Sequence, residues 1–452
     1  MAIKPNQPPS SDARPPDARL TLRGAVFLGI GAMVGAGIFA LLGEAGAIAG
    51  SAVWISFLAA GVVSLALGYA MAKMGTRYPS SGGLITYLIH GFGNGRLVGV
   101  AAWLGYLTAI VVVGAMVAVS FGEYASAIVV GDNNATGWTK LFASAMVLAT
   151  TFLCIIGPRT VDRAQSVIVI ALLAVFAIFV VVTLTHLDTH LLAPSGYPSV
   201  NSIVSSIALT FFAYLGFAVI SFTGGDLENP RRNLPRAMYV ALGVTTVLYV
   251  AIALGVFGTL TVSQVVEFGP TAIAEAVRPT LGDAGFAAMA IAALLATASS
   301  VTATLYASEG LTSALADVGQ FPTVFGKTSR LGPHGGLWIT TVATLLFVNV
   351  FDLGALASIG SAVSLAVFVL VGVAAIRLRH TIGANLAILL AGVIFSIVVL
   401  VVFAVDTYGN DPKAFWTMIL LPVLALVLDA VWKHRDAGTA PAAGGEDQRD
   451  RS

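Results

Sequence analysis

The segment Gly29-Ile30-Gly31-Ala32-Met33-Val34-Gly35-Ala36-Gly37-Ile38-Phe39 lies inside a long apolar run that begins at Leu22. It holds four glycines within nine residues. Each glycine costs a helix about 1 kcal/mol relative to alanine, so the segment predicts a helix interrupted near Gly35 to Gly37. The freed backbone N–H groups and the positive end of the following half-helix would bind a carboxylate. Close helix packing through Gly31 and Gly35 is the alternative interpretation.

The composition of the whole chain indicates the surroundings of this segment. Of the 452 residues, 57% are apolar and only 10% are charged, whereas soluble domains carry roughly 25% charged residues. Apolar stretches long enough to cross a lipid bilayer begin near twelve positions: Leu22, Ser51, Leu97, Leu141, Val161, Ser202, Ala237, Ala284, Leu337, Leu353, Ala384 and Phe415. The chain is therefore predicted to be an all-α integral membrane protein of about twelve transmembrane helices.

The positive charges predict how these helices are oriented. Only Lys140, Arg278 and Lys413 fall on one side of the predicted membrane, and the other 20 of the 23 basic residues fall on the side that holds both termini. Since basic residues concentrate in cytoplasmic loops, the protein is predicted to lie in the cell membrane with both termini cytoplasmic. Residues 1–20 and 433–452 are expected to be disordered cytoplasmic tails on either side of a membrane domain at 21–432.

Several classes of function are excluded by the types of residue present. A net charge of +1 gives no basic excess for binding nucleic acid. Cys154, the one cysteine, is expected to be a small buried hydrophobic residue, and no metal or other cofactor is predicted. The six histidines fall in or beside connections, and the acidic residues fall near span ends or outside the spans. No catalytic arrangement can be assembled from mid-membrane residues, so the chain is predicted not to be an enzyme.

A second interruption is predicted five spans after the first. The sixth span, residues 207–226, places Gly216 among aromatic residues in mid-membrane. Spans one to five, about 22–185, and six to ten, about 201–377, form two sets of five, and an odd number makes the second set run inverted. Two further helices follow at about 383–432. Paired interrupted helices in an inverted repeat indicate a substrate site at the membrane midplane of a secondary transporter.

Five motifs resemble those of the amino acid–polyamine–organocation (APC) superfamily of permeases, whose bacterial amino acid permeases share the LeuT-like fold with a 5+5 inverted repeat. They are Gly31 to Phe39, Tyr78 to Gly83, Phe211 to Phe217, Glu228 to Ala237, and Ala303 to Ser308. The resemblance extends in register over about residues 20–380. It implies a secondary active transporter that moves a small-molecule amino acid by alternating access.

The resemblance also implies roles for individual residues. The substrate carboxylate would rest on the backbone of Met33, Gly35, Ala36 and Gly37, with Ile38 alongside, and the amino group would face carbonyls near Phe212, Ala213 and Tyr214. Phe212 would cover the substrate from outside, and Gly216 would permit the bend. The loop of Pro79, Ser80, Ser81, Gly82 and Gly83 would form the inner gate, although a plain turn explains it as well.

Three departures from the family pattern bear on the substrate and on the coupling ion. The acidic residue that many relatives carry directly after the Gly-Phe of the sixth span is Ala218 here, and Glu309-Gly310 replaces an arginine at the end of the eighth span. Proton-linked relatives carry a lysine in the middle of the fifth span, but Arg163 to Val182 contains none and Leu172 lies nearest its place, which argues against a lysine-centred proton mechanism. Since a buried cationic group needs a partner carboxylate, we expect a neutral, zwitterionic amino acid. A permease for cationic amino acids or polyamines, and an amino acid sensor of the same fold, remain alternatives.

The coupling ion is left open by the sequence. Sodium would find oxygen ligands in span-one carbonyls and the hydroxyls of Ser299, Ser300 or Thr302. Those hydroxyls are equally able to bond their own helix. Proton coupling and exchange without an ion are the alternatives, and no obligate protein partner is inferred.

Overall fold

The structure is a computed structural model and describes residues 20–131, 136–156, 158–225, 227–326, 332–410 and 412–439. The described part is helical, and its only β-type pairing is the isolated bridge between Leu20 and Leu227. Most of the predicted tails, at 1–19 and 440–452, lies outside the described residues. The last helix continues to Thr439, into the segment expected to be the C-terminal tail.

The first half of the chain holds seven α-helices and one π-helical turn. They are α1 (Leu22–Ala49), α2 (Val53–Arg77), α3 (Gly83–Phe92), α4 (Arg96–Tyr106), the π-helical turn Leu107–Val112, α5 (Val113–Val129), α6 (Thr136–Ile156) and α7 (Pro158–Thr185). The Thr21 hydroxyl accepts a hydrogen bond from the Gly24 N–H and so caps the start of α1. Helix α4 passes through the π-helical turn into α5 without a break.

The second half is longer and contains shorter helices between the long ones. They are α8 (Val200–Phe212), α9 (Phe217–Phe222), α10 (Pro230–Phe257), α11 (Val262–Phe268), α12 (Ala272–Glu275), α13 (Arg278–Asp317), α14 (Gly335–Val350), α15 (Leu353–Arg377), α16 (Arg379–Ile382), α17 (Leu386–Asn410) and α18 (Pro412–Thr439). Helix α13 has a kink at Gly282, whose φ of 63° lies outside the helical region. Ser199 and Asp352 cap the starts of α8 and α15.

A helix lies at or within a few residues of each of the twelve predicted span starts. Within the described residues, nine segments are long and apolar enough to cross a membrane, and the first of these, Leu22–Arg77, contains both α1 and α2. Gly335–Val350 and Met418–Trp432 are also apolar but shorter. The protein is thus a multi-pass helical membrane protein, while the count of twelve and the inverted repeat remain predictions.

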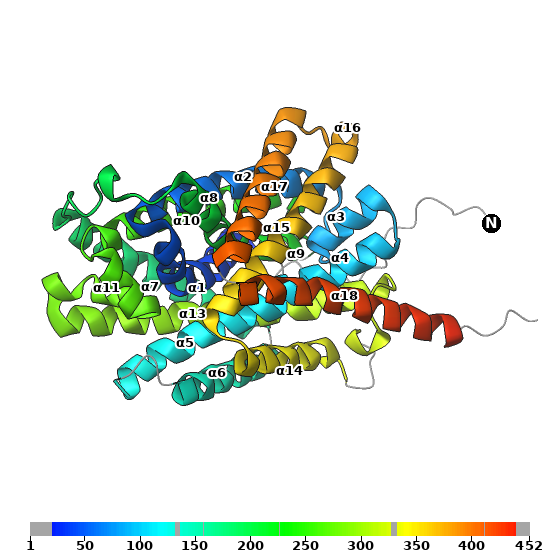
Figure 1. Ribbon diagram of the computed structural model, residues 1–452. Helices are drawn as coiled ribbons and strands as arrows, with labels where there is room; N and C mark the ends of the chain where they lie inside the picture. The colour runs from blue at the N-terminus through cyan, green and yellow to red at the C-terminus, as the bar shows by residue number, and fades with distance from the viewer. Residues whose placement is uncertain are drawn as a thin grey trace, which may run out of the picture.

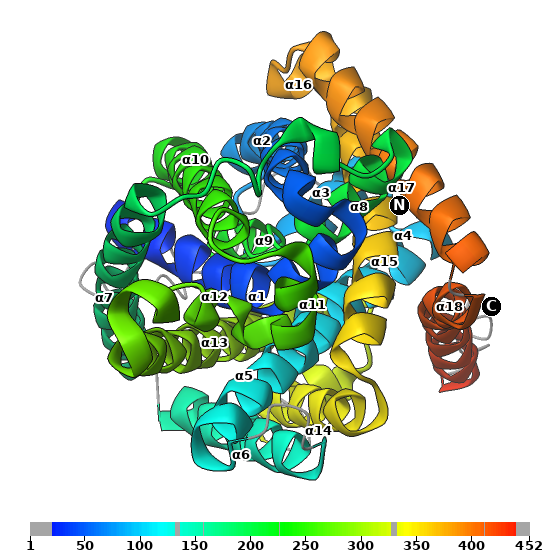
Figure 2. The ribbon, with the colours of Figure 1, turned by 60° about the vertical axis from the view of Figure 1, so that its left-hand side comes forward.

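Helix α1 lies in the middle of the bundle, and Figure 2 shows it crossing the centre with α9 beside it and α10, α7, α13 and α5 around it. Helices α6 and α14 pack side by side at the periphery in both views, and α17 and α18 lie on the outer side of α15 (Figures 1 and 2). The apolar window of Val200–Phe222 is 89% buried, whereas that of Leu386–Asn410 is 33% buried. The central helices are therefore enclosed by protein, and the outer ones present apolar side chains to lipid.

Candidate functional site

The predicted interruption of the sixth span is present in the structure. Helix α8 ends at Phe212, residues 213–216 form turns, and α9 begins at Phe217. The turn is held by short-range bonds: the Tyr214 N–H donates to the Phe211 carbonyl at 2.9 Å, and the Phe217 N–H donates to the Tyr214 carbonyl at 3.0 Å. The i→i−4 bonding of an α-helix therefore gives way to i→i−3 bonds at mid-span, where the glycine and its aromatic neighbours predicted an interruption.

The predicted interruption of the first span is not present. Helix α1 is one α-helix from Leu22 to Ala49, and it continues through Gly35, Ala36 and Gly37. The N–H groups expected to receive a carboxylate are thus within the helix. Of the two predicted discontinuous helices, only the second is broken in this conformation.

Tertiary contacts explain why the glycines of α1 do not break it. A Cβ added at Gly35 would lie 2.1 Å from the Ala296 carbonyl oxygen, and one added at Gly37 would lie 2.1 Å from the Tyr249 hydroxyl. The α8–α9 turn approaches equally closely, because a Cβ at Gly216 would lie 2.4 Å from the Met33 nitrogen. The glycines permit close helix packing, and that packing outweighs their low intrinsic helix propensity.

Two hydroxyl groups from other helices bond to carbonyls of α1. Tyr249 of α10 donates to the Met33 carbonyl at 2.5 Å and lies 3.2 Å from the Ala213 carbonyl. Ser300 of α13 donates to the Ala32 carbonyl at 3.0 Å. Both side chains are fully buried. Tyr249 was not among the residues selected from sequence; the only available signal was that a tyrosine inside an apolar span needs a partner for its hydroxyl.

Phe212 lies at the end of α8 and packs against α15. Its side chain is 1% exposed, and a Cβ added at Gly360 would lie 2.1 Å from its Cζ atom. One helical turn further out, Leu209 and Ala357 line a cavity of about 730 Å³ near the Ala49 end of α1. Phe212 therefore lies between this cavity and the centre of the bundle.

This cavity, which we call the outer cavity because it lies further from the centre of the bundle than Phe212, has polar and acidic side chains in its lining. Its lining includes Glu44, Asp352, Asp406 and Asn410. Asp352 also accepts the Ala355 N–H at 2.8 Å, and Asp406 accepts the Ser205 hydroxyl at 2.7 Å. Two of the three carboxylates thus already have local partners. In the described part of the chain, no group of three or more histidine, cysteine or acidic side chains is arranged to hold a metal ion.

At the Leu22 end of α1, the loop predicted as an inner gate is tightly packed. A Cβ added at Gly83, whose φ is 48°, would lie 2.4 Å from the Phe222 ring, and one added at Gly225 would lie 2.4 Å from the Ser81 hydroxyl. Within the loop, the Ser80 hydroxyl accepts the Gly82 N–H at 3.0 Å. The loop therefore packs against the end of α9 at this end of the bundle, while the cavity lies at the opposite end.

The three hydroxyls considered as ion ligands have different partners. Ser300 bonds to α1, as described above. Thr302 donates to the Ala298 carbonyl of its own helix at 2.8 Å, and Ser299 is buried without a hydrogen-bond partner in the described structure. The structure brings only Ser300 to a carbonyl of α1.

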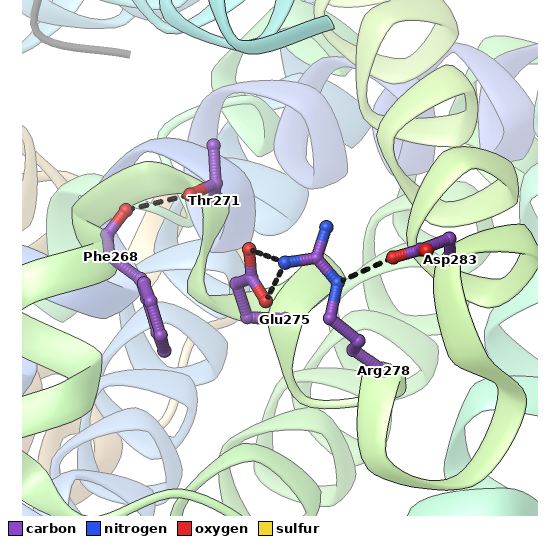
Figure 3. A network of polar contacts seen from close by, with 5 residues as sticks. All are labelled: Phe268, Thr271, Glu275, Arg278 and Asp283. Atoms are coloured by element: carbon purple, nitrogen blue, oxygen red, sulfur yellow. Dashed lines mark hydrogen bonds and ion pairs between the residues drawn. The ribbon is translucent and has the colours of Figure 1, made fainter. Parts of the chain in front are cut away.

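A charged segment packs over the Ala49 end of α1. There α11, α12 and the start of α13 carry a network in which Arg278 contacts Glu275 at 2.9 Å and Asp283 at 3.3 Å (Figure 3). Burial raises the pKa of Glu275, whose side chain is 12% exposed, and the Arg278 guanidinium partly opposes that shift. The Tyr124 hydroxyl of α5 donates to the Pro270 carbonyl and ties the segment down.

The sequence of this chain is similar to those of known membrane transporters. Residues 20–428 match the family described as "Amino acid permease". The chain belongs to the amino acid permease family. This permease is 34% identical to the inner membrane transport protein YbaT of Escherichia coli (strain K12) over 415 residues, which cover 92% of this chain and 96% of that one. It is 27% identical to the branched-chain amino acid permease BcaP of Bacillus subtilis (strain 168), over 78% and 79% of the two chains.

A solved structure supports the fold of the permease. The crystal structure of a mutant of the Eremococcus coleocola manganese transporter superposes with a TM-score of 0.59 over 95% of each chain at 12% sequence identity. At that identity the likeness shows the fold alone, and it agrees with the LeuT-like architecture predicted from the motifs.

Proposed function

We propose that this permease moves neutral, zwitterionic amino acids across the cytoplasmic membrane by alternating access. One observation carries the proposal: the three side chains that bond to or cover the middle of α1 and the α8–α9 turn, Tyr249, Ser300 and Phe212, are uncharged. Such a site offers backbone dipoles and hydroxyls to a carboxylate and an ammonium group. A cationic side chain or a polyamine would need a buried carboxylate as well.

The difference between the two ends of the bundle supports alternating access. The Pro79 to Gly83 loop packs against the end of α9 at one end, and the 730 Å³ cavity lies at the other, separated from the centre by Phe212. A transporter of this kind opens its central site to one side at a time. We propose that the present conformation has its inner gate closed and that Phe212 is the outer cover.

Uptake into proteoliposomes tests the substrate. Purified protein is reconstituted and supplied with labelled alanine, leucine, arginine or putrescine in separate reactions. We expect alanine or leucine to accumulate, in keeping with the name of the relative BcaP. Preferred uptake of arginine or putrescine would refute the neutral substrate, and binding of leucine without accumulation would identify a sensor.

Sodium is the coupling ion that we propose to test first. The Ser300 hydroxyl and the Ala32 carbonyl lie 3.0 Å apart, and oxygen atoms of these kinds are the ligands that sodium prefers. Uptake is measured with a sodium gradient, with a proton gradient and with neither. Stimulation by sodium that Ser300→Ala removes supports the proposal; equal uptake in all three conditions indicates exchange without an ion.

We further propose that the Leu22 end of α1 faces the cytoplasm, because 20 of 23 basic residues lie on that side of the predicted topology. Gly95 and Gly196 lie in exposed connections at opposite ends of the bundle, and a Cβ at either would meet nothing within 4 Å. Each is replaced by cysteine in a Cys154→Ser background. A membrane-impermeant maleimide applied to whole cells should label Gly196→Cys and spare Gly95→Cys.

A further inference from the structure

The continuous helix α1 has no free backbone N–H groups at the position where a substrate carboxylate is expected to bind. In an α-helix the N–H of each residue bonds to the carbonyl four positions earlier. The N–H groups of Ala36 and Gly37 are therefore paired with the carbonyls of Ala32 and Met33. A carboxylate gains these N–H groups only if this turn opens, which leaves both carbonyls without their helical donors in a buried part of the bundle, where an unsatisfied carbonyl is costly.

Those same two carbonyls each have a second donor from another helix. Ser300 donates to the Ala32 carbonyl at 3.0 Å, and Tyr249 donates to the Met33 carbonyl at 2.5 Å. A carbonyl oxygen has two lone pairs and accepts two hydrogen bonds. Each carbonyl therefore keeps one donor whether the turn is closed or open.

We propose that Ser300 and Tyr249 are positioning residues that stabilise an opened α1 turn, in which the N–H groups of Ala36 and Gly37 face the substrate carboxylate. This inference rests on the proposed function, since it assumes a substrate with a carboxylate. Gly35 and Gly37 flank the turn and supply the backbone freedom that opening requires. The two hydroxyls reduce the cost of opening the turn, because neither carbonyl is then left without a donor.

Tyr249 also couples the two halves of the substrate. Its single proton lies within reach of two acceptors, the Met33 carbonyl at 2.5 Å and the Ala213 carbonyl at 3.2 Å. No backbone N–H of the described residues bonds to the Ala213 carbonyl. When the substrate ammonium takes the Ala213 carbonyl, the Tyr249 proton is committed to Met33, so binding at the α8–α9 turn favours the open form of α1.

Hydrogen exchange without any amino acid tests the inference directly. The full-length protein in lipid nanodiscs and sodium-free potassium buffer is compared with Ser300→Ala and Tyr249→Phe, following backbone amides of residues 33–40. If the hydroxyls stabilise the opened turn, each variant exchanges about tenfold more slowly there. Exchange that is unchanged or faster overturns the inference, because the hydroxyls would then stabilise the closed helix or neither state.

Matched controls separate this role from the general loss of a buried hydroxyl. Ser56 donates to the Ile203 carbonyl of another helix at 3.1 Å, and the Tyr106 hydroxyl bonds to the Thr340 hydroxyl at 2.9 Å. Neither contacts α1 through these bonds. Ser56→Ala and Tyr106→Phe should leave exchange at residues 33–40 unchanged, and slowing of the same size in these controls would overturn the inference.

Calorimetric titration with leucine, or with alanine if leucine is not bound, provides the second readout. Tyr249→Phe and Ser300→Ala should each weaken binding about tenfold while the melting temperature of the substrate-free protein stays near that of the wild type. A lower melting temperature with unchanged affinity overturns the inference. If the wild type binds none of the amino acids tested, the proposed function fails, and the exchange comparison still decides the behaviour of α1.

Discussion

The aromatic ring of Phe212 lies against the backbone of Gly360, where the end of α8 meets the first third of α15. A Cβ at Gly360 would lie 2.1 Å from the Cζ atom and 2.5 Å from the Cε2 atom of the ring. The outer cavity ends one turn away, at Leu209 and Ala357. The absence of a side chain at one position of α15 therefore allows Phe212 to lie between the cavity and the centre of the bundle.

Gly360→Ala should displace the Phe212 ring without unfolding the protein, because the clash falls on the far end of a side chain that can rotate. We expect release of bound leucine to accelerate severalfold, measured as the rate at which label leaves preloaded protein on dilution. Gly354→Ala is the control, since a Cβ there meets its nearest atom at 3.4 Å. An unchanged rate in Gly360→Ala would show that the position of the ring does not control release.

Phe212→Ala should also accelerate release, and in addition it should destabilise the protein by about 3–5 kcal/mol through the cavity that it leaves. Phe211→Ala serves as the matched variant. Phe211 is equally buried but packs against Phe368, with ring centroids 5.8 Å apart. Thermal unfolding should report a similar loss for both variants, and only Phe212→Ala should change the release rate. Equal release rates in the two would argue against an outer cover at Phe212.

Gly37→Leu should abolish amino acid binding. The added Cβ would lie 2.1 Å from the Tyr249 hydroxyl and 2.6 Å from the Ala213 carbonyl oxygen, so the side chain enters the space between α1 and the α8–α9 turn. Overpacking of this kind costs about 1–3 kcal/mol, which we expect to lower the melting temperature without preventing insertion.

The control for Gly37→Leu is Gly243→Leu in α10, where an added Cβ meets nothing within 4 Å. Calorimetry should show normal binding in this control. Normal binding in Gly37→Leu would contradict a substrate site between α1 and the α8–α9 turn.

Arg278→Gln should make the stability of the protein more sensitive to pH. Burial raises the pKa of Glu275, so the folded state favours the protonated carboxyl. The resulting stability is fully present below the ordinary pKa of glutamate and is lost as the pH rises through the raised value. Removing the Arg278 charge raises that pKa further, so the variant should lose more stability than the wild type between pH 4 and pH 7.

The effect of Arg278→Gln should remain below about 1 kcal/mol, because the Arg278 side chain is 43% exposed. Melting temperatures across this pH range provide the measurement. Lys140→Gln removes a basic residue whose ammonium group donates to the Asn349 carbonyl at 2.7 Å. The curve of melting temperature against pH for Lys140→Gln should therefore run parallel to that of the wild type. A parallel curve for Arg278→Gln as well would show that Glu275 does not titrate as argued.

Much of the architecture could be predicted because its signals are local. The apolar runs predicted helices at or near every expected span, and the aromatic residues around Gly216 predicted the α8–α9 break. The first-span glycines predicted a break because four glycines lower helix propensity, whereas their effect in the folded chain depends on Ala296, Tyr249 and the turn at Ala213 to Gly216. Those partners lie more than 170 residues away in sequence and leave no local pattern.

By itself, the sequence determined that this protein is a helical membrane permease, because apolar length and family motifs are properties read along one chain. Only the tertiary structure decided that α1 is closed, that Ser300 and Tyr249 reach its carbonyls, and that Phe212 meets Gly360. The physical reason is that helix propensity amounts to about 1 kcal/mol per glycine, while close packing and buried hydrogen bonds act between helices distant in sequence.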